Sequence, residues 1–307
     1  LQQNERRNLY NKNYTRKNMY KLVAIYLDGT LLNSYGEVSE KNKKAIKKAM
    51  QNGKEIVIAS GRPLQSAKSF ALESGASNYV TCGNGSLLYD VRNDKILFDK
   101  FIDRQKVLEI IKICEENSIF YCLYTENLTI SKTLNYNILF YNNENKKMPE
   151  DKQTNIKIIS DIYKYVEENP NIGILKITIC DESSIIFGGI IKRLRQISDV
   201  DVLDVQHMAR KVITSGTEDV KVEYHYTEIT SKDVNKWMAI QNLANRLNIK
   251  PSEVIAIGDN MNDMEMIENA GLGVIMGNSA EYMHEFADVV APTNNDDGVA
   301  YILEKYL

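Results

Sequence analysis

Residues 20–34 read YKLVAIYLDGTLLNS, and this stretch decides the fold. Residues 21–27 form an apolar run of strand length, which is typical of a strand buried on both faces of a parallel sheet. Asp28 and Gly29 follow at once, and a glycine allows the chain to leave the strand in a sharp turn. Open α/β sheets bind their ligands beyond the carboxyl ends of such strands, so the sequence predicts a functional site here.

The segments that follow alternate between helix and strand. Residues 40–52 place small and apolar side chains on one helical stripe that Gly53 ends, and residues 55–59 form a second buried strand. Pro63 suits the first position of another helix, and residues 79–82 form a third strand. The same rhythm returns in predicted helices and strands at 231–247, 253–257, 261–269, 272–275, 288–290 and 298–306. This alternation predicts an α/β fold, with a parallel sheet and helices on both of its faces.

The middle of the chain has a different pattern. Residues 86–99 predict a hairpin, and residues 142–153 form a polar loop. Helices are predicted at 104–117, 158–169 and 184–196, and strands near 119–131, 173–180 and 200–205. This mixed α+β block interrupts the parallel sheet and is most simply a separate domain inserted into the first. We therefore expect a core domain formed by residues 20–85 and 206–307, and an inserted domain at 86–205.

Composition narrows the class of protein and its partners. The 307 residues carry a net charge of −3, which gives no electrostatic basis for binding nucleic acid. No apolar run approaches the roughly 20 residues that span a bilayer, so no membrane is expected as a partner. The four cysteines and three histidines form no metal-binding pattern. Reduced thiols fit a cytoplasmic protein, and we expect a monomer or a small homo-oligomer.

Residues 1–19 are basic and rich in asparagine, with no apolar core. This pattern excludes a secretory signal and predicts a disordered leader. An amphipathic targeting segment is a weaker alternative, because arginine is present but serine is absent.

Two stretches in the first half of the chain place polar groups at the ends of predicted strands. In YLDGT, positions 26 and 28 point to the same side of the strand. In ASGRP, the hydroxyl of Ser60 and nearby backbone N–H groups could hold a phosphate, and Arg62 adds positive charge. Taken alone, Asp-Gly is also a common turn and Ser60 a common helix cap, so neither stretch is specific by itself.

Two further stretches lie near the C-terminus. Lys236 falls early in a predicted helix and can neutralise a phosphoryl group as a point charge. Asp259 and Asp263 follow a predicted strand, and their carboxylate oxygens suit Mg²⁺, a hard cation. The alternatives are a solvated lysine and a helix capped by Asn260 and Asn262. Two neighbouring acidic groups weigh against capping alone.

The order and spacing of the four stretches resemble the haloacid dehalogenase superfamily, specifically its Cof-type sugar-phosphatase branch. Further matches are GNGS at 83–86 and GNSAEYMHEFADVVAPTNNDDGVA at 277–300, and the resemblance covers residues 20–307. It implies a Rossmann-like core with a large α/β cap domain inserted after the third strand. It also implies a Mg²⁺-dependent phosphatase of small phosphorylated metabolites, sugar phosphates in particular.

The resemblance also implies roles for residues of this chain. An aspartate at position 26 would attack the phosphate monoester, and Asp28 would protonate the leaving alcohol and then activate water. Ser60 and Lys236 would bind the phosphoryl group. The residues that would line the substrate pocket are Gly29, Thr30, Gly61, Arg62, Asn84 and Asn295.

The same resemblance implies a metal site. Mg²⁺ would be held by Asp259, by the carboxylate at position 26 and by the main-chain carbonyl of Asp28. Asp263 would support these ligands.

Tyr26 departs from this pattern, because it stands where the nucleophilic aspartate is expected. A phenol has an unperturbed pKa of about 10, so it is mostly neutral at pH 7 and a poor ligand for Mg²⁺. It cannot form an aspartyl phosphate, and its ring would enter the phosphoryl pocket. Tyrosine acts as a nucleophile only with an activating base or strongly positive surroundings. We therefore expect little or no turnover, since losing a nucleophile costs orders of magnitude in kcat.

Three interpretations remain open. One is a catalytically inactive protein that binds a phosphorylated metabolite or a partner. Another is an altered position in an otherwise active lineage, since one base change converts an Asp codon into a Tyr codon. The retained residues favour this second interpretation: Asp28, Ser60, Lys236, Asp259 and Asp263. The third is phosphoryl transfer between sugars, as in mutases of the superfamily, against which the large predicted cap argues by resemblance.

Overall fold

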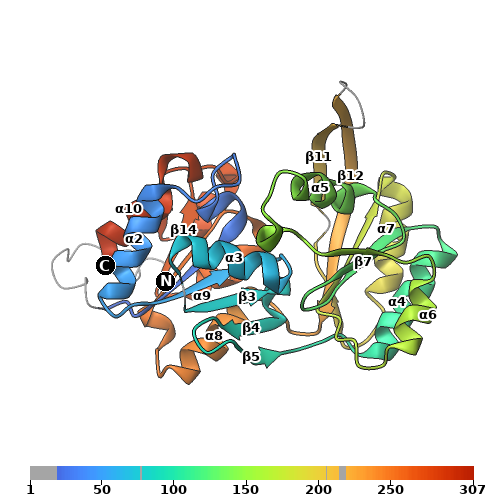
Figure 1. Cartoon of the computed structure of the whole chain (residues 1–307), viewed down its shortest axis with the longest axis horizontal. Helices are drawn as coiled ribbons and strands as arrows, with labels where there is room; N and C mark the ends of the chain where they lie inside the picture. Colours follow the sequence, from blue (N-terminus) through green and yellow to red (C-terminus); the bar gives the residue numbers. More distant parts are fainter. Residues whose placement is uncertain (1–18, 77, 205, 214–218) are drawn as a thin grey trace. The chain divides into compact units, whose positions relative to one another are not determined.

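The computed structural model describes residues 19–76, 78–204, 206–213 and 219–307 (Figure 1). Residues 1–18, nearly all of the predicted leader, lie outside the described residues. Every helix among the described residues is too short or too polar to cross a membrane.

The chain divides into two compact units. The first is formed by the described residues up to Gly61, by Ala67–Phe98 and by Asn235–Leu307. The second is formed by Arg62–Ser66 and Asp99–Val234.

A sheet of eight strands forms the centre of the first unit, in the order β15-β14-β13-β1-β2-β3-β4-β5. Its parallel strands are β1 (Leu22–Tyr26), β2 (Glu55–Ala59), β3 (Tyr79–Cys82), β13 (Val254–Gly258), β14 (Leu272–Met276) and β15 (Val289–Ala291). β1 lies between β13 and β2, which explains why the first four residues of this strand are fully buried. The predicted parallel sheet is therefore confirmed, and Tyr26 ends its central strand.

The predicted hairpin at 86–99 continues this sheet. β4 (Leu87–Asp90) pairs antiparallel with β3, and β5 (Lys95–Asp99) lies beside β4 at the edge. All four residues of β4 are buried, so the hairpin completes the core of the first unit. The inserted block therefore runs from Asp99 to Val234, rather than over the predicted residues 86–205.

Helices cover both faces of the sheet, as the sequence predicted. The helices of the first unit are α2 (Glu40–Gln51), α3 (Leu64–Ser74), α8 (Lys236–Arg246), α9 (Met264–Asn269) and α10 (Gly298–Tyr306). Leu22 and Ala24 join Ile240 of α8 in one apolar cluster, to which α9 also contributes. Val23 and Ile25 point to the other face, because side chains alternate along a strand, and they are equally buried. Figure 1 shows α2 and α10 side by side, and the two helices contact each other.

α8 begins later than predicted. The apolar pattern suggested a helix from residue 231, but a strand of the second unit continues to Ser231 and α8 starts at Lys236. Asn235 is the N-cap, since its side-chain oxygen accepts the N–H of Met238 at 2.7 Å. Lys236 is therefore the first residue of the helix.

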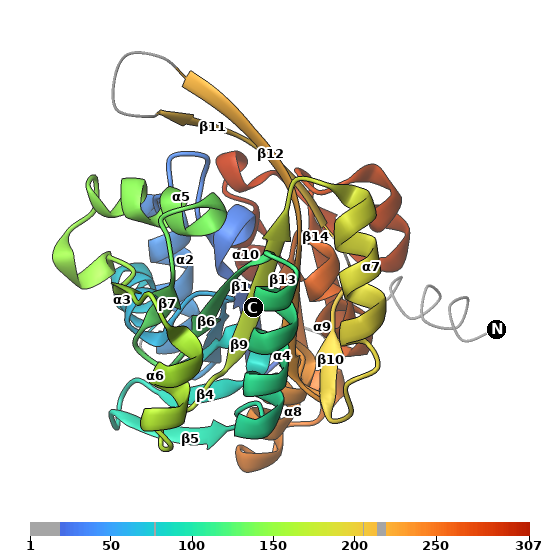
Figure 2. The same cartoon turned by 90° about the vertical axis from the view of Figure 1, so that its right-hand side faces the viewer.

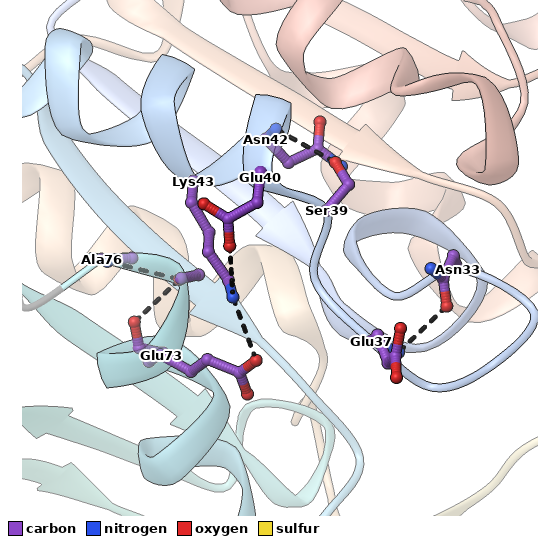
Figure 3. A network of polar contacts seen from close by, with 10 residues as sticks. Asn33, Glu37, Ser39, Glu40, Asn42, Lys43, Glu73 and Ala76 are labelled. Atoms are coloured by element: carbon purple, nitrogen blue, oxygen red, sulfur yellow. Dashed lines mark hydrogen bonds and ion pairs between the residues drawn. The ribbon is translucent and has the colours of Figure 1, made fainter.

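Polar contacts hold the start of α2 (Figure 3). The hydroxyl of Ser39 accepts the N–H of Asn42 at 3.1 Å and caps the helix. One turn further on, the Lys43 ammonium lies 3.3 Å from the Glu73 carboxylate of α3. The ion pair thus connects α2 to α3 within the first unit.

The second unit has its own seven-stranded sheet, in the order β10-β12-β9-β6-β7-β8, with β11 paired to β12. Its strands are β6 (Phe120–Tyr124), β7 (Thr129–Ser131), β8 (Ile156–Ile158), β9 (Lys176–Asp181), β10 (Val200–Val202), β11 (Gln206–Ile213) and β12 (Asp219–Ser231). Its helices are α4 (Arg104–Glu116), α5 (Tyr136–Asn145), α6 (Ile162–Glu168) and α7 (Ser184–Leu194). Leu123, Ile177 and Ile179 of the sheet pack in one apolar cluster with α4, α6 and α7, and Figure 2 shows these helices on the same side of the sheet.

Two predictions for this unit were wrong. The polar loop expected at 142–153 overlaps the end of α5 and a short 3₁₀ turn at Glu150–Lys152. α5 buries only Ile138 among its apolar residues, so its sequence has no apolar stripe that would predict a helix. The helix is held in part by a hydrogen bond from the Asn137 amide to the Tyr124 hydroxyl. The core domain was expected to resume at residue 206, but the residues that follow form β11 and β12, which pair within the second sheet.

The other face of the second sheet carries a buried ion pair. The Lys176 ammonium contacts the Glu228 carboxylate, and the two side chains are only 5% and 16% exposed. The ammonium also lies 4.6 Å from the centre of the Tyr124 ring. Because a buried charge is costly without a partner, each charge of this pair depends on the other.

We predict that Glu228→Gln lowers the free energy of unfolding by about 3 kcal/mol, because it leaves the Lys176 ammonium buried without its counter-charge. The matched control is Glu168→Gln, which breaks the exposed Lys164–Glu168 pair and should cost less than about 0.5 kcal/mol. Urea unfolding of both variants measures the difference. Equal losses in the two variants would contradict the prediction.

Candidate functional site

The site begins where β1 ends. After Tyr26 the chain forms a wide turn over Leu27–Leu31, in which Gly29 has a positive φ of 76°. A Cβ atom at Gly29 would lie 2.4 Å from Oδ2 of Asp259, which is closer than atoms can approach. Both the backbone conformation and the neighbouring carboxylate therefore require glycine here. The turn places the Thr30 hydroxyl against Asp259, at the end of β13.

Asp259 follows β13, the strand next to β1. The buried hydroxyl of Thr30 donates a hydrogen bond to Oδ1 of Asp259 at 2.6 Å. Burial raises the pKa of the Asp259 carboxyl to about 7, and the nearby carboxylates of Asp263 and Asp28 act in the same direction. The Thr30 hydroxyl and the Lys236 ammonium offset only part of this effect. A positive group beside Asp259 would therefore stabilise the charged form of its carboxyl.

Lys236 and Asp263 form a fully buried ion pair at the same place. The Lys236 ammonium contacts Oδ1 of Asp263, and the two side chains are 1% and 0% exposed. The other oxygen of Asp263 accepts the N–H groups of Asp259 and Asn260, both at 3.1 Å. Gly258 leaves room for this arrangement, since a Cβ there would lie 2.5 Å from Cβ of Asp263.

Tyr26 also reaches Lys236. The Lys236 ammonium lies 3.6 Å from the centre of the Tyr26 ring, which is a direct cation–π contact. Such a contact is worth about 2 kcal/mol or more when it is desolvated. The phenol ring of the partly buried Tyr26 thus occupies the space beside the ammonium where the resemblance implied a carboxylate.

The remaining predicted residues lie at several places. Ser60 is fully buried after β2, and its N–H donates to the carbonyl of Thr81 at 2.8 Å. Asn84 is buried in the turn after β3 with a positive φ of 59°. Gly61 is the last residue of its segment in the first unit, whereas Arg62 groups with the second unit and donates to Ser66 at 3.4 Å.

Asn295 contacts Ser34, in the loop that follows the Leu27–Leu31 turn. Its side-chain oxygen accepts the N–H of Ser34 at 2.9 Å, and its amide nitrogen donates to the Ser34 hydroxyl at 2.8 Å. Its role as a pocket residue stays a prediction.

Sequence reasoning missed Asn278 and Asn294. The amide of Asn278 donates to the carbonyl of Gly29 at 2.9 Å, and its oxygen accepts the N–H of Asn294. Asn294 in turn donates to the carbonyl of Leu32 at 2.8 Å. These two residues bind one carbonyl within the turn that carries Asp28 and one carbonyl just after it. Both fall in the stretch quoted at 277–300, but an isolated asparagine gives no local signal of such a contact.

The residues fit Mg²⁺ only in part. The Asp259 carboxylate suits a cation, because burial and, secondarily, the neighbouring carboxyl groups raise its pKa, and a bound cation would stabilise its charged form. The carbonyl of Asp28 could be a second ligand, whereas Asp263 is engaged with Lys236 and two N–H groups. Within the described residues no group of three acidic, histidine or cysteine side chains could hold a metal. Position 26, where the resemblance implied a carboxylate donor, has a phenol.

Comparison with known proteins places these residues in a family. The sequence matches the family model described as haloacid dehalogenase-like hydrolase over residues 23–303. The chain is 28% identical to Phosphatase YwpJ of Bacillus subtilis, with 94% of this chain and 100% of that protein covered. It is 26% identical to 5-amino-6-(5-phospho-D-ribitylamino)uracil phosphatase YcsE of the same species, with 94% and 96% covered.

A solved structure of a haloacid dehalogenase-like hydrolase from B. subtilis has the same fold. It matches with a TM-score of 0.77 at 27% identity, and the match covers 94% of this chain and 100% of that one.

We predict that Asp259→Asn removes a pH dependence of stability in metal-free protein. Below pH 4 the carboxyl is protonated in both the folded and the unfolded state. Between pH 4 and 7 it ionises only in the unfolded state, because its folded pKa is raised to about 7. The free energy of unfolding should therefore fall by up to about 4 kcal/mol over this range.

Urea unfolding in EDTA from pH 4 to 8 tests this expectation. Asp204→Asn, which changes an 88% exposed side chain, is the control and should keep the slope of the unaltered protein. The same slope in Asp259→Asn would show that the carboxyl is not perturbed.

Proposed function

This chain belongs to the haloacid dehalogenase-like hydrolases and is by family a phosphoric monoester hydrolase, and we propose that its first unit carries a phosphatase site for small phosphorylated metabolites. We further propose that the site is Mg²⁺-dependent in form and that sugar phosphates are the substrate class. In this chain, Tyr26 in place of the nucleophile leaves little or no turnover.

The convergence of groups at one edge of the sheet supports the proposal. Lys236, Asp259 and Asp263 come from α8 and from the loop after β13, and they meet the end of β1 through direct contacts. Burying an ammonium next to two carboxylates costs desolvation free energy, and such clusters are typical of functional sites. This cluster is well suited to a phosphoryl group, whose charge the ammonium can neutralise.

In the proposed reaction, a carboxylate at position 26 would attack phosphorus, and the phosphoryl group would pass from the substrate oxygen to that carboxylate. Asp28 would give its proton to the leaving alcohol and later take one from the water that releases phosphate. Lys236 would neutralise charge on the phosphoryl oxygens. Asn278 would hold the turn in place through the Gly29 carbonyl, so that Asp28 stays beside position 26.

Bound Mg²⁺ would supply positive charge for the phosphoryl oxygens, and Asp259 with the Asp28 carbonyl would hold it. The phenol of Tyr26 leaves this donor set incomplete, so we expect weak metal affinity in the present chain.

The proposed class of substrate rests on the relatives. One relative is named as a phosphatase of a ribityl phosphate, which is a phosphate ester of a polyhydroxylated chain.

We propose that the second unit is the cap domain that the resemblance implied. The four cysteines are all free and buried, which supports a cytoplasmic location.

A second candidate function is favoured by Tyr26 itself. A chain that lacks the nucleophile could serve as a non-catalytic binding protein for a phosphorylated metabolite or a partner. In that case the retained Lys236 and Asp259 would bind a ligand without chemistry.

We predict that Tyr26→Asp raises the rate of p-nitrophenyl phosphate hydrolysis in Mg²⁺ by at least about 10³-fold, because it restores both the nucleophile and the missing metal donor. Tyr35→Asp is the matched control, since Tyr35 is 86% exposed and should give no gain. An equal rate in the unaltered chain would contradict the mechanism. A folded but inactive Tyr26→Asp variant would favour the binding protein.

A further inference from the structure

We infer that the ring of Tyr26 closes the phosphate site of this chain, so that the chain is defective in binding phosphate as well as in catalysis. This inference rests on the proposed function, because it takes Lys236 as the group that would bind the phosphoryl oxygens. It goes further in separating two defects that one substitution causes, a missing nucleophile and a blocked anion site.

The first support is the geometry around the ammonium. An oxyanion that binds an ammonium must approach its nitrogen to about 2.7–2.9 Å. The Tyr26 ring covers one side of the Lys236 nitrogen, at 3.6 Å from the ring centre, and Asp263 contacts another. With a side chain only 1% exposed, Lys236 has no open side toward solvent.

The second support is the position of the ring at the solvent boundary. Along β1 the burial is complete from Leu22 to Ile25 and becomes partial at Tyr26. Lys236, by contrast, is fully buried. The residue that is partly exposed is thus the one that contacts the hidden ammonium. The ring occupies a boundary position, where a smaller side chain would leave the ammonium accessible.

The third support is the balance of charge. Asp28 and Asp263 both act on the Asp259 carboxyl, so three carboxyl groups lie close together, and the Lys236 ammonium contacts Asp263 and also acts on Asp259. An arriving anion therefore meets negative surroundings unless it contacts Lys236 directly. By preventing this contact, the ring removes the attraction of the Lys236 ammonium for phosphate.

The experiment measures the affinity for inorganic phosphate by isothermal titration calorimetry, in buffer with EDTA and no added metal, so that no gain can come from a metal ion bound at position 26. Tyr26→Asn removes the ring and matches the shape of aspartate without supplying a nucleophile. We expect it to bind phosphate at least about tenfold more tightly than the unaltered chain. Tyr26→Ser is a second ring-free variant, which serves if the asparagine variant fails to fold.

Tyr26→Phe is the matched control, because it keeps the ring and loses only the hydroxyl. It should bind phosphate as weakly as the unaltered chain. Adding Lys236→Met to Tyr26→Asn should abolish the gain, since the ammonium is the group that becomes accessible. Circular dichroism confirms the folding of each variant.

Two results would overturn the inference. One is phosphate affinity in the unaltered chain equal to that of the ring-free variants. The other is a gain in Tyr26→Phe, which would assign the effect to the hydroxyl rather than to the ring. Both are distinct from a failure of the proposed function, which is the absence of phosphatase activity in folded Tyr26→Asp.

Discussion

The buried ion pair of Lys236 and Asp263 is the interaction on which the rest of the site depends. Neither charge has access to water, so each is tolerated only because the other is present. The second oxygen of Asp263 accepts two N–H groups and thereby orders the loop after β13. Thr30 connects that loop to the turn after β1 through Asp259. A single carboxylate therefore joins α8 to the central strands and determines where the other polar groups lie.

The side chain at position 26 affects both the charge around Lys236 and the oxygen donors that are available to a cation. A carboxylate there would add a negative partner for Lys236 and a hard oxygen donor for a cation. The phenol ring contacts the ammonium through its π face. A neutral phenol is a poor ligand for a hard cation such as Mg²⁺. Burial and, secondarily, the neighbouring carboxyl groups of Asp263 and Asp28 raise the pKa of Asp259. The contacts among Lys236, Asp259 and Asp263 are present, while position 26 adds no negative charge to them.

Local patterns predicted the elements of the parallel sheet well, because strands buried on both faces must be continuous apolar runs. The strands at 55–59 and 79–82 and the helix at 298–306 have the predicted bounds. Prediction failed where local pattern and tertiary context disagree. Residues 231–235 read as helix but hold the end of β12 and the cap of α8, and α5 has no apolar stripe that could reveal it.

The sequence by itself determined the alternation of strands and helices and placed Asp28, Ser60 and Asp259 at strand ends, because burial and turn formation act between near neighbours in the chain. Only the tertiary structure decided that Tyr26 lies against Lys236 and that Asn278 holds the carbonyl of Gly29. These partners are far apart in sequence, and they meet through the order of strands in the sheet and the packing of α8. No local periodicity carries that information.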